Sequence, residues 1–72
     1  MPTQIETYIR SLAVDYLFYI EAMDSGAYDL DDLQKIASQR SICHDELIRL
    51  LGDAYARPFD MRAYCRQLVN DT

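Results

Sequence analysis

The chain has 72 residues, half of them hydrophobic, and its twelve acidic and seven basic residues give a net charge of −5. This length allows a single domain over residues 1–72, and the hydrophobic content excludes a disordered chain. The two cysteines, Cys43 and Cys65, are too few for a disulfide scaffold, so we expect reduced thiols in a cytoplasmic protein.

No membrane association is expected. The first residues lack the basic segment and apolar core of a signal peptide. The longest unbroken apolar run, Tyr16 to Ile20, is far shorter than a membrane span requires.

The first predicted helix covers residues 4–23. Thr3 and Glu6 have the spacing of a capping box at its start, and Gly26 can take the left-handed conformation that follows a helix. Apolar residues recur three or four positions apart along it, which is the period of one helical face. They are Ile5, Tyr8, Ile9, Leu12, Ala13, Tyr16, Tyr19, Ile20 and Met23.

A second apolar stripe lies on the opposite side of this helix. Val14 and Phe18 are one turn apart, with Leu17 beside them. A helix that is apolar nearly all round is buried on more than one side, so either other helices enclose this stripe or it contacts another molecule. We expect a contact surface and, because small domains often bury excess apolar surface by pairing, a homodimer.

Three shorter helices are predicted to follow, over residues 30–38, 42–56 and 61–70. Asp29 and Ser41 are suitable N-caps for the first two. Gly52 lies inside the predicted helix 42–56, where a glycine lowers helix stability by about 1 kcal/mol relative to alanine. Its presence there suggests that another helix passes close to it. The fold class predicted is therefore all-α, a small four-helix bundle with a long N-terminal helix.

The start of the last predicted helix depends on Pro58, which forbids continuation of the preceding one. Asp60 is then the expected N-cap. Phe59 before it is expected to pack against Tyr64 as a hydrophobic staple.

Residues 30–51 have a helix-turn-helix-like spacing, with a short connection at Ser38 to Ser41. Asp45 and Glu46 at the start of its second helix would, however, face the DNA phosphates and repel them. A helix-turn-helix-like DNA-binding transcriptional regulator, acting as a dimer, is therefore the alternative function, and direct nucleic-acid binding is not the expected one.

No catalytic, cofactor or metal site is expected, and the chain is not predicted to be an enzyme. Cys43, His44 and Cys65 are fewer soft ligands than a zinc site needs. Cys65 could approach His44 if the last two helices pack antiparallel, but a single histidine near a helix start is usually an exposed polar residue. With two glycines, the chain has no phosphate-binding loop.

The negative charge is concentrated in the first half of the chain. Residues 1–36 hold seven acids and two bases, and residues 37–72 hold five of each. One purely acidic stretch repels phosphates and favours a basic partner, although part of it also suits the cap and first turn of the second helix. Its members are Glu21, Asp24, Asp29, Asp31 and Asp32.

The expected function is non-enzymatic binding to another protein, in the form of a small acidic adaptor or inhibitor. The expected interface combines the second stripe with the acidic stretch: Val14, Leu17, Phe18, Glu21, Asp24, Asp29, Asp31 and Asp32. Compact acidic helical proteins from phages and mobile elements commonly block host machinery, including nucleic-acid-processing proteins. That origin is an expectation from size and charge alone.

Overall fold

The computed structural model describes residues 3–71. In this range the chain forms α1 (Gln4–Asp24), α2 (Leu30–Leu51), a short 3₁₀ turn η1 (Asp53–Tyr55) and α3 (Pro58–Asn70), with no strand. The all-α prediction is confirmed, whereas the predicted count of four helices is wrong. None of the described helices combines the length and apolar character needed to cross a bilayer.

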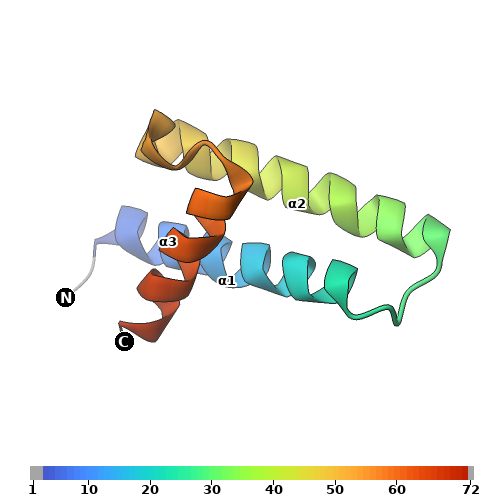
Figure 1. The fold of residues 1–72 in the computed structure, drawn as a ribbon. Helices are drawn as coiled ribbons and strands as arrows, with labels where there is room; N and C mark the ends of the chain where they lie inside the picture. Colours follow the sequence, from blue (N-terminus) through green and yellow to red (C-terminus); the bar gives the residue numbers. More distant parts are fainter. Residues whose placement is uncertain (1–2, 72) are drawn as a thin grey trace.

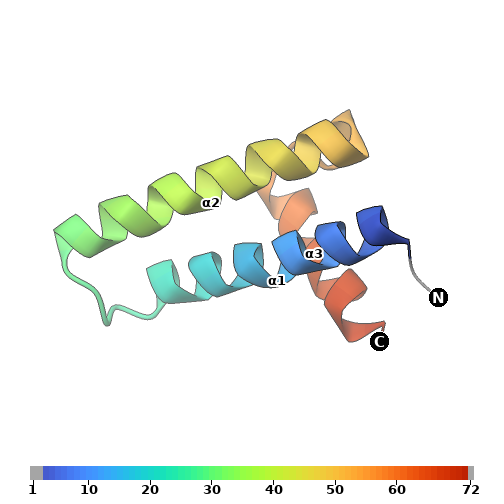
Figure 2. The same cartoon turned by 180° about the vertical axis from the view of Figure 1, so that it is seen from behind.

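The two long helices form an antiparallel hairpin. α1 and α2 lie side by side, joined by residues 25–29 (Figure 1). α3 crosses one side of this hairpin, near the end where α1 starts and α2 finishes, as the views from front and back agree (Figure 2). The molecule measures 40 × 24 × 20 Å. Because α3 packs near the other end, the loop end of the hairpin is an arm of two helices with no third helix over it (Figure 1).

The predicted starts of the first two helices are confirmed by their caps. The Thr3 hydroxyl accepts a hydrogen bond from the Glu6 N–H at 3.1 Å, and the Asp29 carboxylate accepts one from the Asp32 N–H at 2.9 Å. Each cap satisfies a backbone donor that has no partner within its helix. Gly26 has a φ of 73°, which allows the chain to turn after α1.

The helix-turn-helix-like middle is wrong, because α2 runs without interruption through residues 38–41. Ser38 to Ser41 contains neither glycine nor proline, so nothing in the backbone chemistry forces a break there. An inward row with alternating three- and four-residue steps also continues across it, and a turn would have interrupted that row. The row consists of Leu30, Leu33, Ala37, Arg40, His44, Leu47 and Leu51.

Gly52 ends α2 instead of lying inside a helix that reaches residue 56. Its φ of 83° and ψ of −170° suit glycine alone among common residues. A Cβ at this position would meet no atom within 4 Å, so the expectation that another helix passes close to Gly52 is wrong.

α3 begins at Pro58, three residues earlier than predicted. Proline at the first helical position loses no hydrogen bond, and Arg57 before it takes the extended backbone that proline imposes. Asp60 lies in the first turn and is not the N-cap. The predicted staple is also wrong, because Phe59 is 82% exposed and Tyr64 packs against Tyr55, with ring centroids 4.4 Å apart.

The core lies where α3 crosses the hairpin. All three helices contribute to it, through Ala13, Tyr16, Cys43, Leu47, Met61 and Cys65. Apolar residues farther along the arm, such as Ile20, Met23 and Leu33, are only half-buried. The arm therefore keeps apolar surface that the third helix does not cover.

Candidate protein-interaction site

The second stripe of α1 faces outward. Val14 is 49% exposed and Phe18 is 60% exposed, while Leu17 is half-buried and packs against the core. The Phe18 ring meets the ring of Tyr19 edge-on, with centroids 5.9 Å apart. α2 and α3 enclose other sides of α1 and leave Val14 and Phe18 uncovered.

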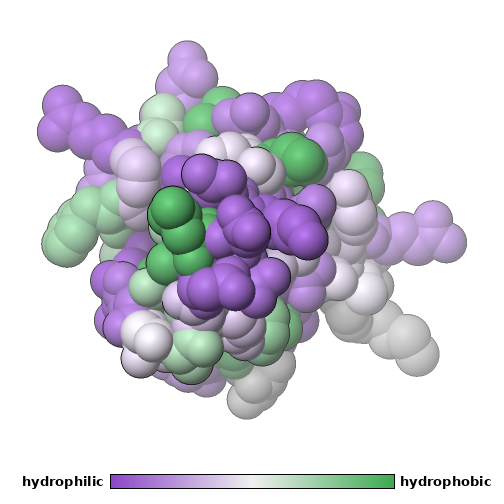
Figure 3. Space-filling view, turned by 90° about the vertical axis from the view of Figure 1, so that its right-hand side faces the viewer, coloured by the Kyte–Doolittle hydropathy of each residue, from purple (hydrophilic) through white to green (hydrophobic). Residues whose placement is uncertain are grey.

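The acidic residues gather toward the loop end of the hairpin. Glu21 and Asp24 lie in the last turns of α1, and Asp29, Asp31 and Asp32 lie at the start of α2; all five are exposed. Asp29 is also the N-cap, so part of the acidic stretch has the structural role that its spacing suggested. Figure 3 looks onto this end, where hydrophilic side chains surround a small hydrophobic area.

These five carboxylates are not neutralised within the chain. Over residues 3–71 the one ion pair joins Arg49 to Glu46, on the opposite end of α2. Exposed, unpaired carboxylates at one end create a negative potential that attracts basic surfaces.

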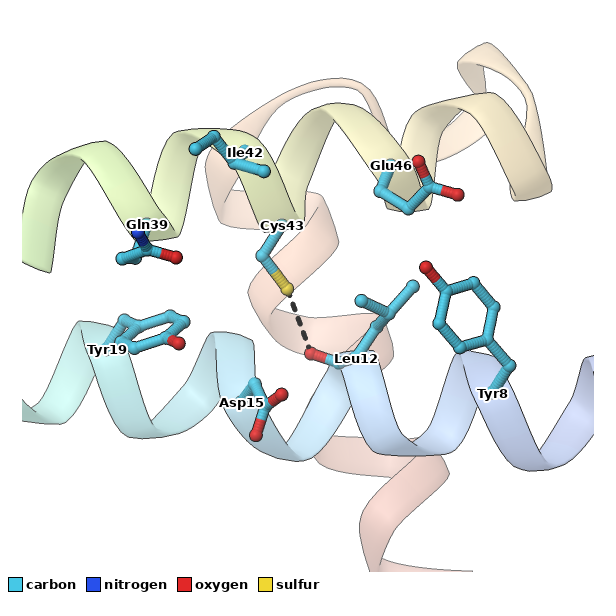
Figure 4. A pocket seen from close by; sticks show the side chains of 8 residues that line it. All are labelled: Tyr8, Leu12, Asp15, Tyr19, Gln39, Ile42, Cys43 and Glu46. Carbon is cyan, nitrogen blue, oxygen red and sulfur yellow. Dashed lines mark hydrogen bonds between the residues drawn. The ribbon is translucent and has the colours of Figure 1, made fainter.

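A groove of about 210 Å³ between α1 and α2 lies beside the stripe. Figure 4 shows α3 behind the two helices, so the groove opens on the side away from α3. Tyr19 links the two features, because it lines the groove and contacts Phe18. The lining residues are Tyr8, Leu12, Asp15, Tyr19, Gln39, Ile42, Cys43 and Glu46.

The polar groups of this groove suit a cation. A hydrogen bond from Arg49 holds the pKa of Glu46 below its usual range, and a hydrogen bond from Tyr8 acts in the same direction, so Glu46 stays charged. Asp15 supplies a second carboxylate. Because Glu46 already pairs with Arg49, Asp15 is the carboxylate of the groove that has no ion pair within residues 3–71, and a lysine or arginine side chain could bind beside it.

Cys43 forms a neutral wall of the groove. Its thiol donates to the Leu12 carbonyl, with Sγ 3.1 Å from the oxygen (Figure 4). Burial raises the pKa of Cys43 to about 11, so the thiol keeps its proton at neutral pH. Both cysteines are free and buried.

His44 is buried, contrary to the expectation of an exposed histidine. Its Nε2 lies 2.8 Å from the Ala56 carbonyl oxygen, which can only accept, so Nε2 carries the hydrogen. Nδ1 then accepts from the Tyr16 hydroxyl at 3.0 Å. With both nitrogens engaged, His44 offers no base to Cys65, and burial raises the pKa of that thiol to about 12.

Sequence reasoning missed a second groove, on the α3 side of the hairpin, with a volume of about 370 Å³. It is lined by Tyr16, Ile20, Met23, Asp24, Arg40, Pro58, Phe59 and Arg62. The continuous row on α2 could have indicated it, since that row extends beyond the reach of a short α3.

The described side chains contain no group of three His, Cys, Asp or Glu residues that could hold a metal ion. The surface features described above are exposed apolar residues, carboxylates and grooves. No known protein family, curated protein or solved structure was found to match the chain.

Proposed function

We propose that the chain is a non-enzymatic protein-interaction module, a small acidic adaptor or inhibitor that binds another protein. Its partner face consists of Val14, Leu17, Phe18, Glu21, Asp24, Asp29, Asp31 and Asp32, with the groove of Figure 4 beside it. The observation that carries the proposal is the exposure of Val14 and Phe18 next to a groove with two carboxylates.

The apolar and acidic parts of this face have different roles. Aromatic residues at the centre of an interface contribute most of the binding energy, and Phe18 is the largest such residue here. Carboxylates at the edge mainly raise the association rate and select partners of opposite charge. Binding should therefore be fast at low salt and should weaken as ionic strength rises.

The proposed partner has a basic surface, of the kind that otherwise holds nucleic acid. The carboxylates at the start of α2 would occupy positions that phosphates take on such a surface. Covering it would block a nucleic-acid-processing protein, which is the inhibitory form of the proposal and the form that suits a phage or mobile element.

No observation favours the DNA-binding alternative. A recognition helix that follows a turn is absent from residues 30–51, where α2 is a single helix. Asp31 and Asp32 in its first turn would repel the DNA backbone.

The test is capture of a partner from the source cell by the immobilised chain, with identification of the retained protein by mass spectrometry. Phe18→Ser should lower affinity roughly thirtyfold, as loss of an interface hot spot does. The double variant Asp31→Ala/Asp32→Ala should also lower affinity, and the loss should be larger at low salt than at high salt.

Ile5→Ser is the matched control, because Ile5 is exposed on the same helix but lies outside the partner face. It should leave capture unchanged. If the Phe18→Ser variant retains the partner as well as the wild-type chain does, the proposal is contradicted. A shift of duplex DNA by the wild-type chain in a gel at low salt would also contradict it.

A further inference from the structure

Two rows of residues run along the hairpin on the side where α3 packs. The row on α1 is Ile9, Ala13, Tyr16, Ile20 and Met23, and the row on α2 is Leu30, Leu33, Ala37, Arg40, His44, Leu47 and Leu51. Both alternate three- and four-residue steps, which is the pattern of helices that pack along their length against another helix. We call the space between the two rows the trough.

α3 fills only one end of the trough. Ala13, Tyr16, His44 and Leu47 are buried there. Toward the loop, Ile20, Met23, Leu33 and Ala37 are half-buried, and Leu30 is 71% exposed. The packing pattern of the hairpin therefore continues past the helix that covers it, and these five residues form the open end of the trough.

The first turn of α3 meets the open end at the groove of about 370 Å³. There the Nε atom of Arg62 is buried without a hydrogen-bond partner, which is costly for a charged group. Arg40 and Arg62 form no ion pair within residues 3–71, and Phe59 stands exposed at the edge. Asp24 lines the same groove but forms no ion pair with either arginine, so the groove suits an apolar side chain accompanied by a carboxylate.

The charges of the trough are arranged along its length. Asp24, the last residue of α1, and Asp29, the N-cap of α2, lie at the loop end. Arg40 and Arg62 lie toward α3. Asp24 shares a groove with the two arginines, but the carboxylates lie on the loop side of it and the guanidinium groups on the α3 side. A second trough laid antiparallel on the first therefore brings the carboxylates of each copy toward the arginines of the other.

We propose that the open end of the trough binds the same surface of a second copy, in an antiparallel, twofold-symmetric pair. Leu30 and Asp24 of each copy then lie against Phe59 and Arg62 of the other, as the isologous symmetry of a dimer requires. Two helical segments from each copy enclose a shared apolar centre, in the manner of a four-helix bundle.

This surface is separate from the partner face except at Asp24 and Asp29, which belong to both. At about 100° per residue, Asp31 and Asp32 point away from the row that contains Leu30. The groove of Figure 4 opens on the opposite side of the hairpin. Loss of self-association and loss of partner capture are therefore distinguishable outcomes.

The first experiment is sedimentation equilibrium of the full chain at low salt, over micromolar to millimolar concentrations. The open segment of α2, residues 30–37, is only about 12 Å long, so we expect a weak, concentration-dependent dimer. Leu30→Ser should weaken association at least about tenfold, because it removes the apolar contact with Phe59.

Ile42→Ser is the matched control. Ile42 is 61% exposed on the same helix, but it lines the groove on the side away from α3. It should leave the dimer intact. Both substituted side chains are exposed, so unfolding curves followed by circular dichroism should match that of the wild-type monomer.

The second experiment exchanges charges. Asp24→Arg alone and Arg62→Glu alone each place like charges opposite one another in the pair, and each should weaken self-association about tenfold or more. Mixing the two variants restores opposite charges at both contacts, so an equimolar mixture should form a heterodimer of about wild-type affinity.

The proposal is overturned if the wild-type chain is monomeric up to millimolar concentration. It is also overturned if Phe18→Ser, and not Leu30→Ser, abolishes the dimer, since the stripe on α1 would then join the copies. A mixture of the charge variants that stays as weak as either variant alone would contradict the antiparallel arrangement.

Discussion

The hydrogen bonds of His44 join three separate parts of the chain. Tyr16 comes from α1, His44 from α2, and Ala56 from the segment after η1. The caps at Thr3 and Asp29 could be predicted because each bond spans three residues of sequence. The burial of His44 could not, because it depends on a partner 28 residues away and on a carbonyl that only the folded chain places.

Removing the Tyr16 hydroxyl should destabilise the protein. Tyr16→Phe leaves Nδ1 of a buried histidine without its donor, which costs about 1–3 kcal/mol. Urea unfolding followed by circular dichroism measures the change in the free energy of unfolding. Tyr28→Phe, at an exposed tyrosine, is the control and should change it by less than about 0.5 kcal/mol.

The buried thiols make stability depend on alkaline pH. Burial raises the pKa of Cys43 to about 11 and of Cys65 to about 12, from an ordinary value of 9.0. Above pH 9 the unfolded chain loses thiol protons that the folded chain keeps, so the free energy of unfolding should fall as the pH rises toward 11.

Urea midpoints at a series of pH values test this dependence. Cys65→Ala should lower stability at neutral pH but make the alkaline decline shallower. Burial also raises the pKa values of Tyr16 and Tyr64, so some decline should persist in that variant. If the urea midpoint stays constant or increases when the pH is raised above 9, the raised thiol pKa values would be contradicted.

At the scale of elements, α2 shows where local patterns stop being sufficient. Ser41 has the chemistry of an N-cap, yet the same residue is tolerated within a helix when the inward row continues on both sides. Pro58 likewise suits either a helix end or a helix start. The choice between these depends on how α2 and α3 pack, which a window of a few residues does not contain.

The end of α2 is a test of backbone conformation alone. Gly52→Ala should cost about 1–3 kcal/mol, because its φ of 83° with ψ of −170° is open almost only to glycine. The added methyl group would contact nothing within 4 Å, so the cost is backbone strain without a clash.

Chemical synthesis with D-alanine at position 52 provides the matched control. It adds the same methyl group with the chirality that a positive φ favours, and so should not destabilise the protein. Equal losses of stability for L- and D-alanine, measured by urea unfolding, would show that the backbone at this position is not the cause.

For the whole molecule, the position of α3 determines which part of the hairpin is buried most and has the highest local stability. The buried core lies under α3, and the loop end of the hairpin is two helices thick. The apolar periodicity predicted the buried positions Ala13 and Tyr16 of α1, but it placed Ile5 and Tyr8 on the same face and both are exposed. It could not predict which of them α3 reaches, because the crossing position of α3 is a property of the assembled fold.

Amide hydrogen exchange should reveal this difference. In dilute solution, amides of residues 18–24 and 30–38 should exchange faster than those of residues 9–16 and 43–51, because fewer buried contacts hold the arm closed. Mass spectrometry of peptic fragments gives the rates. Equal protection along both helices would contradict the predicted difference between core and arm.

The placement of α3 on one side of the hairpin has a consequence for avidity (Figure 2). In a pair joined through that side, the two Phe18 stripes point outward, so the assembly is bivalent. A target with repeated basic sites would bind the dimer at two points. The second contact would form at a high effective concentration, because the dimer holds the two stripes together. A modest affinity at each stripe would then suffice for long residence on a polymeric or multimeric target.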